Sequence, residues 1–412
     1  MALIVQKYGG SSVATPDRIK NVARRVAKTA DAGNEVVVVV SAMGDTTDNL
    51  IKLAKEITSN PSDREMDMLL STGEQQSIAL LAMALNELGY NAVSLTGQQA
   101  GVMTDKAHSK AKIVSVDSSR MIKELEAGNI LIVAGFQGID EHGEVHTLGR
   151  GGSDTSAVAL AIGLDADFCE IYTDVDGVYT ADPRIVKKAR KLQEISFDEM
   201  LEMAFLGAGV LQPRSVEVGK IFNMPICVRS SFNDNEGTMV LEEKDMKRLE
   251  NDVVVSGVAY DDDLLKVTIY NIPHVPGIAA KVFTALGDAN VNVDMIVQSG
   301  ARGGLGGLND ISFTTSKEDD GKIESILRPV LDEIGGGEVL VQKGIAKVSI
   351  IGAGMITNPG VAAKMFRVLS DKGYNIQMIS TSEIKVSCIL SQDVAKDAVV
   401  ALHTAFDLDD DE

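Results

Sequence analysis

The sequence predicts a three-layer α/β sandwich around a mainly parallel sheet, followed by two ferredoxin-like α+β units. Three observations predict this fold class. The chain has 412 residues, which is too long for one ordinary hydrophobic core. Its first part alternates continuous apolar runs, typical of strands buried on both faces, with helical stretches. Its last part contains one segment twice, each copy reading strand, turn, helix and strand.

The strands of the first part are expected at short apolar runs. Residues 35–43, EVVVVVSAM, form the clearest central strand. A first strand at residues 2–6 leads through a glycine turn to a helix that begins at Thr15-Pro16-Asp17, an N-cap, proline and acid sequence. Further strands are expected at residues 91–95, 129–136, 167–173 and 225–230.

The repeat in the last part predicts two sensing modules. Residues 266–296 match residues 347–379, and the shared PG-(I/V)-A-A-K-(V/M)-F core recurs after 83 residues. Asn292 and Asn375 are separated by the same 83 residues. A Pro-Gly turn exposes the amides at a helix N-terminus, which attract a carboxylate such as that of an amino acid. A duplicated module without ligand is the alternative. The predicted boundaries are residues 1–247, 264–335 and 345–412, joined by a charged connector.

Composition excludes several classes of partner. The formal net charge of −20 disfavours nucleic acid and means that any anion site must be locally basic. The N-terminus lacks the features of a signal peptide, and no apolar run is long enough to span a bilayer, which favours a cytoplasmic location. The three cysteines lie apart in apolar runs and are expected to be buried thiols. The five histidines are not expected to cluster, and His142 and His146 are expected in a turn. The glycine-rich run at residues 300–307 is expected to be a mobile hairpin loop.

The stretch HTLGRGGSDTSAVALAIGL, residues 146–164, contains the strongest candidate site. Gly151 and Gly152 allow a tight turn with close approach of a ligand. Ser153 and Asp154 are expected at the N-cap of the following helix, whose free amides attract anions. Arg150 adds a planar positive group suited to a carboxylate or phosphate. A purely structural glycine turn with a good N-cap is the alternative.

Other segments that follow strands supply complementary groups. Lys7 precedes Gly9 and Gly10, so that a positive charge lies beside backbone amides, as suits a phosphoryl group. Glu74, at a helix start, and Arg150 together offer one acid and one base for the ammonium and carboxylate of an amino acid. Ser41 and Thr47 add hydroxyl donors. A further loop has polar, aromatic and basic groups that could hold a nucleotide, namely Thr173, Asp174, Tyr179 and Arg184.

No histidine or cysteine base accompanies these groups, and no G-x-x-x-x-G-K-[ST] motif occurs. A carboxylate nucleophile is already ionised near neutral pH, so an enzyme that phosphorylates it needs no general base. Such an enzyme needs positioning and neutralisation of the transferred charge.

The motifs taken together resemble those of the aspartate kinases of the amino-acid kinase superfamily. KYGGSSV at Lys7, VVSAMGDTTD, LLSTGE, TLGRGGSDT and TDVDGVYTADPR all resemble the family's motifs, and the resemblance continues through two ACT domains, over essentially the whole chain. It implies ATP- and Mg²⁺-dependent formation of 4-phospho-L-aspartate, with lysine, threonine or both as feedback inhibitors bound at the ACT pair.

The resemblance also implies a role for each motif residue. Lys7 would stabilise the phosphoryl transition state, and Asp154 would help to orient Lys7. Aspartate would be bound by Ser41, Thr47, Glu74, Arg150, Gly151, Gly152 and Ser153. ATP would be held by Lys7, Gly9, Gly10, Ser41, Thr173, Asp174, Tyr179, Arg184, Gly209 and Val210. The effector would be held by Pro276, Gly277, Asn292, Val293, Asp294, Gln298 and Asn375. No residue is expected to bind a resident metal ion.

One position departs from the family pattern. Gly209 stands in Gly207-Ala208-Gly209-Val210-Leu211, where the family usually has a lysine near the nucleotide phosphates. Weaker ATP binding is therefore expected, with Mg²⁺, Arg214 or Lys220 as candidates to compensate.

Two other functions stay open at this point. A kinase of the same superfamily that acts on another carboxylate, such as acetylglutamate, is disfavoured by the ACT pair. A non-catalytic amino-acid sensor is disfavoured by the intact Lys7, Glu74, Arg150 and Asp154. The expected partners are L-aspartate, ATP and an amino-acid effector. The expected assembly is a homodimer or larger oligomer, or an α2β2 complex with a regulatory subunit initiated near Met246.

Overall fold

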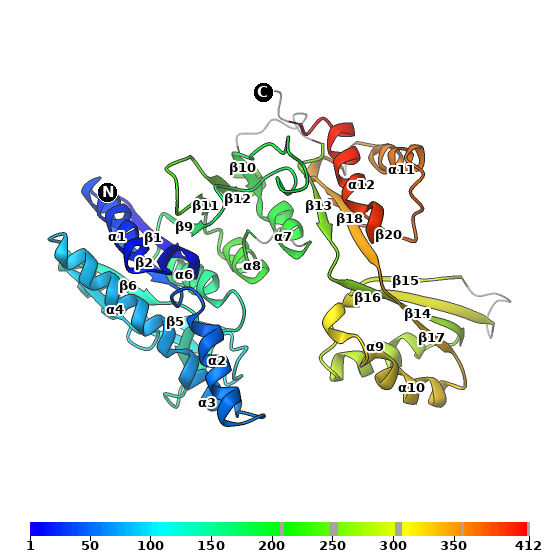
Figure 1. Cartoon of the computed structure of the whole chain (residues 1–412), viewed down its shortest axis with the longest axis horizontal. Helices are drawn as coiled ribbons and strands as arrows, with labels where there is room; N and C mark the ends of the chain where they lie inside the picture. The colour runs from blue at the N-terminus through cyan, green and yellow to red at the C-terminus, as the bar shows by residue number, and fades with distance from the viewer. Residues whose placement is uncertain (207–209, 247–253, 301–306, 356–357, 410–412) are drawn as a thin grey trace. The chain divides into compact units, whose positions relative to one another are not determined.

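A computed structural model describes residues 1–206, 210–246, 254–300, 307–355 and 358–409 of the chain. The chain forms two compact units (Figure 1). The first unit consists of Met1–Val178, Lys191–Ala204 and Gly209–Arg248. The second consists of Tyr179–Arg190, Phe205–Ala208 and Leu249–Glu412.

The first unit is built on an eight-stranded sheet with the order β10-β12-β11-β9-β1-β2-β6-β3. Neighbouring strands are parallel except β11 and β12, which are antiparallel. The predicted α/β fold with a mainly parallel sheet is confirmed. The strands are β1 (Leu3–Tyr8), β2 (Glu35–Val40), β3 (Ala92–Leu95), β6 (Ile130–Ala134), β9 (Phe168–Thr173), β10 (Glu194–Ser196), β11 (Ile226–Ser230) and β12 (Thr238–Leu241).

Helices cover both faces of this sheet. The Gln6 side chain donates a hydrogen bond to Thr29 in α1, whereas the next residue, Lys7, pairs with Asp154 in α6. Because successive strand residues point to opposite faces, α1 and α6 cover opposite faces. The helices are α1 (Pro16–Asp31), α2 (Thr46–Ile57), α3 (Asp63–Leu70), α4 (Thr72–Glu87), α5 (Ser119–Glu126), α6 (Gly152–Gly163), α7 (Phe197–Phe205) and α8 (Pro213–Phe222), with short 3-10 turns η1 (Gly10–Val13) and η2 (Glu243–Asp245).

The start of α1 follows its predicted sequence signals. Thr15 is the N-cap and accepts a hydrogen bond from the amide of Arg18, and Pro16 occupies the first helical position.

A second, smaller sheet of the first unit was not expected from the sequence. Its order is β5-β4-β7-β8, and each strand has only three or four residues. The strands are β4 (Val102–Thr104), β5 (Ile113–Val116), β7 (Gln137–Ile139) and β8 (Val145–Thr147). This sheet leads the chain from β8 into the turn that precedes α6.

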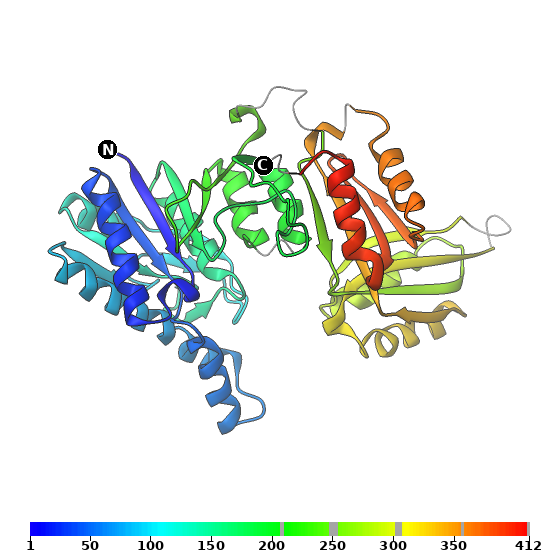
Figure 2. The same ribbon diagram turned by 45° about the horizontal axis from the view of Figure 1, so that its top comes forward.

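The second unit contains the two predicted repeats, each an antiparallel four-stranded sheet with two helices (Figure 2). The first sheet has the order β15-β16-β14-β17 and the second has the order β13-β18-β20-β19. The strands are β13 (Gly257–Asp261), β14 (Leu264–Pro273), β15 (Val293–Gln298), β16 (Leu308–Ser316), β17 (Glu338–Gln342), β18 (Ile345–Ile351), β19 (Met378–Thr381) and β20 (Lys385–Ser391). The helices are α9 (Ile278–Asp288), α10 (Ile323–Ile334), α11 (Val361–Asp371) and α12 (Gln392–Ala405), with 3-10 turns η3 (Lys317–Asp319) and η4 (Ala353–Met355).

The second repeat includes strand β13, which precedes the first repeat in the sequence. β13 pairs antiparallel with β18 from Gly257 opposite Ile351 to Asp261 opposite Lys347. The first repeat is therefore inserted between the edge strand of the second repeat and the rest of that repeat.

The two repeats also share buried contacts within the second unit. Met295 of β15 and Met378 of β19 lie in one apolar cluster. The ammonium of Lys347, on β18, lies 2.5 Å from Oδ2 of Asp294 on β15 and 3.5 Å from Oδ2 of Asp261 on β13.

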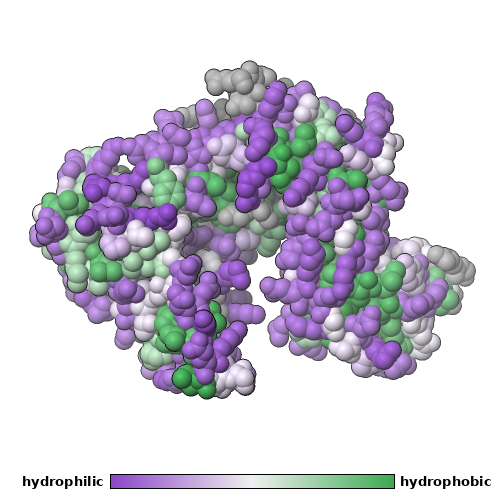
Figure 3. Space-filling model, in the orientation of Figure 1, coloured by the Kyte–Doolittle hydropathy of each residue, from purple (hydrophilic) through white to green (hydrophobic). Residues whose placement is uncertain are grey.

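The visible face of the molecule is mainly hydrophilic, with hydrophobic residues in small groups (Figure 3). All three cysteines are buried, as predicted, and none is in a disulfide. No helix among the described residues is both long and apolar enough to cross a membrane.

Candidate functional site

A cavity of about 570 Å³ lies in the first unit, where β1, β2 and β9 end. Its position agrees with the rule that ligands of parallel α/β sheets bind beyond the carboxyl ends of the strands. The lining residues are Lys7, Gly10, Ser41, Ala42, Gly44, Thr47, Glu74, Phe136, Gly149, Arg150, Gly151, Gly152, Ser153, Asp154, Ile171, Thr173, Val210, Leu211 and Gln212. The structure thus brings together most of the residues that were singled out in the first unit.

An ion pair between Lys7 and Asp154 forms part of the wall. Lys7 Nζ lies 2.6 Å from Asp154 Oδ1, and both side chains are about nine-tenths buried. A carboxylate at this distance holds the ammonium in one position. The ammonium therefore presents a fixed positive charge at the cavity.

The turn before α6 places Arg150 between two glycines with left-handed backbone. Gly149 has φ 76° and Gly151 has φ 71°, values that favour glycine. The predicted N-cap at Ser153 or Asp154 is wrong: α6 begins at Gly152, and Gly151 is its N-cap. Because the left-handed glycine starts the helix earlier, Asp154 lies inside the first turn and its carboxylate is available to Lys7.

Glu74 is a second buried acid of the cavity, beside Asp154. It lies in the first turn of α4, as predicted, and is 3% exposed. Its Oε1 atom accepts a hydrogen bond from the Ala42 amide at 3.0 Å, whereas Oε2 has no partner among the described residues. Burial raises the pKa of Glu74 to about 7, although the Ala42 amide opposes the shift. An unsatisfied buried carboxyl oxygen is suited to a cationic ligand.

Glycines bring the backbone of two loops close together beside Lys7. A Cβ atom on Gly9 would lie 3.4 Å from Lys7 Nζ, and one on Gly10 would lie 2.9 Å from the carbonyl oxygen of Ala42. The carbonyl of Gly10 accepts a hydrogen bond from the amide of Gly44 at 3.1 Å. A side chain at Gly10 would thus separate the loops after β1 and β2.

The residues predicted to hold a nucleotide belong to both units. Thr173 lines the cavity and donates a hydrogen bond to the exposed Asp174. Tyr179 and Arg184 belong to the second unit, where Tyr179 packs against the core of the second repeat and Arg184 pairs with Asp182. The prediction for Gly209 lies outside the described residues, as does the prediction for the loop at 301–306.

The two bases suggested as substitutes for a lysine at 209 are engaged elsewhere. Arg214 donates to the carbonyls of Leu148 and Ala111 at 3.0 and 2.8 Å. Lys220 lies 2.6 Å from Asp198. Neither base lines the cavity, so the structure gives the suggestion no support, and it stays a prediction. Arg214 instead anchors the carbonyl that precedes the Gly149 turn.

Several lining residues were not singled out from the sequence. Ala42 contributes its backbone amide, while Phe136 and Gln212 contribute side chains from segments without a chemical motif. Gln212 lies directly before Pro213, which starts α8, and this signal could have marked it as a loop residue at a helix start.

The predicted effector residues lie in the second unit. Gly277, after Pro276, is the left-handed N-cap of α9, with φ 96°. The equivalent Gly360 caps α11 with φ 100°. The remaining predicted residues lie at β15 and in the loop before β19, namely Asn292, Val293, Asp294, Gln298 and Asn375. Asp294 forms the ion pair with Lys347 described above.

The expectation that the histidines do not cluster is wrong for two of the five. The rings of His108 and His146 lie 4.4 Å apart, centroid to centroid. His146 lies on strand β8 rather than in a turn. Residues so far apart in the sequence meet because β8 and the two strands that flank His108, β4 and β5, belong to the same small sheet.

Comparison with protein families accounts for both units. Residues 2–230 match the model of the amino acid kinase family, and residues 267–332 and 348–406 each match a model of the ACT domain.

The chain is also similar over its full length to known proteins. It is 53% identical to the aspartokinase of Geobacillus stearothermophilus and 51% identical to aspartokinase 2 of Bacillus subtilis; each match covers 99% of this chain and 98% of the relative. Among solved structures, aspartokinase III of E. coli in complex with aspartate and ADP has a TM-score of 0.80 and 27% identity, with 98% and 99% of the two chains covered. The same enzyme in complex with lysine and aspartate has a TM-score of 0.76, again at 27% identity, with the same coverage.

Proposed function

The chain belongs to the amino acid kinase family, as an aspartokinase, and from that premise we propose how its cavity phosphorylates the side-chain carboxylate of L-aspartate. The observation that carries the proposal is the Lys7–Asp154 ion pair in one cavity with Glu74 and Arg150. Glu74 can pair with the ammonium of aspartate, Arg150 with its α-carboxylate, and Lys7 with the transferred phosphoryl group.

Aspartate binds through its α-amino and α-carboxyl groups. The ammonium pairs with Glu74, whose Oε2 atom has no partner among the described residues. The α-carboxylate pairs with Arg150, whose guanidinium can donate two parallel hydrogen bonds to the two carboxylate oxygens. Ser41 and Thr47 supply hydroxyl groups, and the amides of Gly151, Gly152 and Ser153 at the start of α6 supply further donors.

Phosphoryl transfer then needs little chemistry from the protein. The ionised side-chain carboxylate of aspartate attacks the γ-phosphorus of ATP, the bond from that phosphorus to the β,γ-bridging oxygen breaks, and ADP leaves with the electron pair. No proton is removed from the nucleophile. Lys7 stabilises the charge on the transferred group, and Asp154 holds Lys7 in place. The Mg²⁺ ion enters with ATP and neutralises phosphate charge.

ATP is held at the same ends of the strands. Gly9 and Gly10 let the backbone approach the phosphates, and Thr173, Asp174 and Val210 lie on the nucleotide side. We include Tyr179, Arg184 and Gly209 in this nucleotide site on the resemblance of their motifs alone.

A hydroxamate assay with ATP, Mg²⁺ and a series of carboxylates tests this proposal. Aspartyl hydroxamate is expected from L-aspartate, and none from glutamate or acetylglutamate. If product forms only with acetylglutamate, the chain is another kinase of the family. If no product forms although amino acids bind, the chain is a sensor. Lys7→Ala should abolish turnover while the circular dichroism spectrum is kept, and Lys28→Ala, at an exposed lysine of α1, is the matched control. Retained activity in Lys7→Ala would remove Lys7 from the mechanism.

We further propose that lysine, threonine or both inhibit the enzyme through the ACT pair. The supporting observations are the lysine-bound form of the E. coli relative and the two left-handed glycines that begin α9 and α11. The helix amides after Pro276 and Gly277 would donate hydrogen bonds to the effector carboxylate. Asn292, Val293, Asp294 and Gln298, with Asn375 at the equivalent place in the second repeat, would contact the rest of the effector. Binding would shift the population between competent and incompetent kinase states.

Titration of each amino acid, alone and together, in the kinase assay and by calorimetry tests this regulation. Asn292→Ala and Gln298→Ala should raise the inhibitory concentration without changing the uninhibited rate. Asp332→Ala, at an exposed position of α10, should leave inhibition unchanged. Absence of both inhibition and binding for both amino acids would refute the proposal.

We also propose assembly through the ACT units, as a homodimer or larger oligomer, or as an α2β2 complex with a subunit that starts near Met246. Light scattering of the purified protein gives the oligomeric state. A C-terminal tag on the gene reveals any shorter product, which Met246→Leu should remove. A monomer without a shorter product would contradict both forms.

A further inference from the structure

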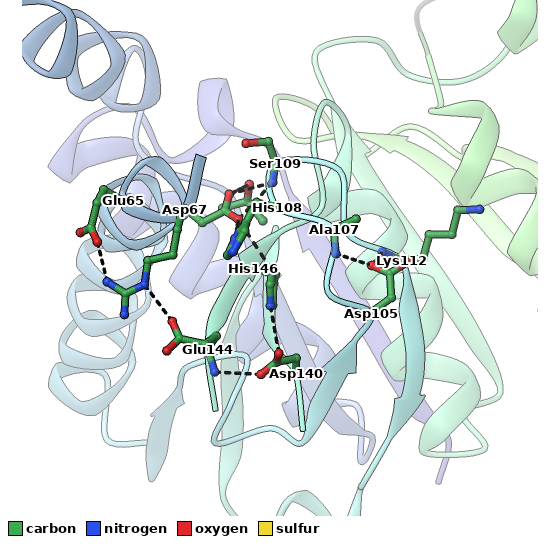
Figure 4. A network of polar contacts seen from close by, with 12 residues as sticks. Glu65, Asp67, Asp105, Ala107, His108, Ser109, Lys112, Asp140, Glu144 and His146 are labelled. Atoms are coloured by element: carbon green, nitrogen blue, oxygen red, sulfur yellow. Dashed lines mark hydrogen bonds and ion pairs between the residues drawn. The ribbon is translucent and has the colours of Figure 1, made fainter. Parts of the chain in front are cut away.

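Three side chains from separate segments of the first unit point toward one another (Figure 4). Asp67 comes from α3, His108 from the segment between β4 and β5, and His146 from β8. One potential ligand atom from each lies within 4.8 Å of the other two. None of these residues lines the cavity of the kinase site.

Asp67 is a fully buried carboxylate. It accepts hydrogen bonds from the Ser109 amide, the Thr147 hydroxyl and His108 Nδ1, the last at 2.8 Å. No lysine or arginine in the described part of the chain forms an ion pair with it. A buried carboxylate is costly unless a positive charge compensates for it. Among the described residues, only the two histidines lie within ion-pair distance of Asp67.

The ring of His146 is buried but forms no hydrogen bond with the described residues. It is 1% exposed, and neither ring nitrogen has a hydrogen bond among the described residues. Its Nδ1 atom lies 3.9 Å from Asp67 Oδ2, and its Nε2 atom lies 3.6 Å from Asp140 Oδ2. Both distances exceed that of a hydrogen bond. The ring therefore faces Asp67 on one side and a second carboxylate on the other.

This arrangement is the one that a metal-bound histidine takes in proteins. A histidine that binds a metal with one nitrogen usually has its other N–H directed at a carboxylate, which fixes the tautomer and orients the ring. With Nδ1 of His146 toward the metal, its Nε2 proton faces Asp140. The Ser109 amide and the Thr147 hydroxyl would hold Asp67 in the same way.

We propose that Asp67, His108 and His146 bind a divalent transition-metal ion, with Zn²⁺ as the best fit. Two imidazoles and one carboxylate form a donor set for zinc and its neighbours, whereas Mg²⁺ and Ca²⁺ prefer oxygen donors alone. Zinc bonds of about 2.0–2.1 Å place tetrahedral ligand atoms about 3.3 Å apart. Oδ2 of Asp67, at 2.8 Å from His108 and 3.9 Å from His146, needs shifts of only a few tenths of an ångström to meet this. The His108 side chain is 27% exposed, which gives the ion an entry path and a water molecule as fourth ligand.

The ion would join the segments that carry the two proposed aspartate-binding charges. Asp67 lies in the helix directly before α4, which carries Glu74, and His146 lies four residues before Arg150. A bond from both to one ion would hold α3 against β8. The exposed Arg64, which lies 2.9 Å from Glu144, already links the same two segments. The ion would therefore link two segments that lead directly to residues of the kinase cavity.

Metal binding to the full-length protein tests the proposal without any measure of kinase activity. The protein is stripped with a chelator and titrated with Zn²⁺ in competition with a chromophoric chelator, and separately with Co²⁺ to record the visible bands of a tetrahedral site. One ion per chain is expected, with a rise in the melting temperature on addition of Zn²⁺. His108→Ala and His146→Val should lose the tight site, the Co²⁺ bands and the thermal shift. His142→Ala, at an exposed histidine nearby, is the matched control and should keep all three.

His146→Val is expected to fold, because valine suits a buried strand position. If this variant nevertheless unfolds, His108→Ala decides the question, since His108 is partly exposed. Absence of tight binding would overturn the proposal, and so would binding that persists in both variants. Each of these results would leave only a hydrogen-bonded histidine–carboxylate cluster.

Discussion

The carboxyl group of Glu74 accepts a hydrogen bond from the backbone amide of Ala42, so that one side chain joins the start of α4 to the loop after β2. The amide stabilises the ionised form of this acid, yet burial prevails and raises its pKa to about 7. Below that pH the free enzyme holds a neutral Glu74, which cannot pair with the ammonium of aspartate.

We therefore predict that kcat/KM for aspartate rises with pH through about 7 and then levels off, because this parameter reports groups of the free enzyme. Glu74→Gln should remove this rise and lower kcat/KM at alkaline pH by roughly 10- to 100-fold, the worth of one hydrogen bond to a charged group. Glu87→Gln, at the exposed end of the same helix, should keep the normal profile. An unchanged profile in Glu74→Gln would assign the pH dependence to another group.

Asp154→Asn should lower kcat more than it changes the KM for ATP. The amide keeps the shape of the side chain but no longer holds the Lys7 ammonium, now at 2.6 Å. Loss of a positioned charge in the transition state predicts a fall in kcat of roughly 10- to 100-fold, measured by steady-state kinetics. Asp17→Asn, at an exposed position in the first turn of α1, is the control. An equal rise in KM with normal kcat would mean that Asp154 acts in ground-state binding.

Gly10→Ala should weaken ATP binding and destabilise the first unit. The added Cβ atom would lie 2.9 Å from the Ala42 carbonyl oxygen, a backbone atom that cannot move without disturbing the amide bound to Glu74. The measurements are the KM for ATP and the melting temperature. Gly287→Ala is the opposite case, since nothing lies within 4 Å of its added Cβ atom in α9. That variant should be more stable by about 0.5–1 kcal/mol with normal kinetics. Equal behaviour of the two variants would contradict the steric argument.

Asp294→Asn should reduce both the stability of the second unit and its response to effector. Lys347 is buried, and its remaining partner, Asp261, lies 3.5 Å away. Since Asp294 itself is half exposed, we expect a loss of about 1–3 kcal/mol in chemical denaturation, below the cost for a fully buried pair. The inhibitory concentration should rise in the same variant. Lys343→Met, which breaks an exposed pair with Asp320, should alter neither property.

Gly209→Lys should lower the KM for ATP, because an added ammonium near the phosphates would attract them. This prediction comes from the sequence alone, since residue 209 lies outside the described residues. The measurement is the ATP dependence of the initial rate. Unchanged KM and kcat would show that the glycine does not weaken binding.

Much of the first unit could be predicted because its strands are continuous apolar runs and its first helix has a strong start signal. The EVVVVV run and Thr15-Pro16 are such signals, and both agree with β2 and α1. The cavity could be anticipated because carboxyl ends of parallel strands meet at one edge. The exact start of α6 could not be predicted, because a run of residues that contains two glycines and two good N-cap residues offers several possible starts, and the helix begins at Gly152.

The small sheet and the histidine pair escaped prediction for a different reason. Strands of three or four residues, such as Val145–Thr147, are too short to show an alternating pattern. His108 and His146 are separated by 38 residues in sequence, and only the pairing of these short strands brings them together. The placement of Tyr179 with the second unit likewise depends on packing, which no local motif encodes.

The strand Gly257–Asp261 restricts how the C-terminal half can be dissected. It is the edge strand of the second repeat's sheet, yet it precedes the first repeat. A single cut between the repeats would therefore separate the second from its own edge strand and expose the backbone of β18. Fragments for isotope labelling, and chimaeras that exchange regulatory modules between enzymes, must carry the whole segment from before Gly257 to the end of α12. The two modules must therefore be transferred as one piece.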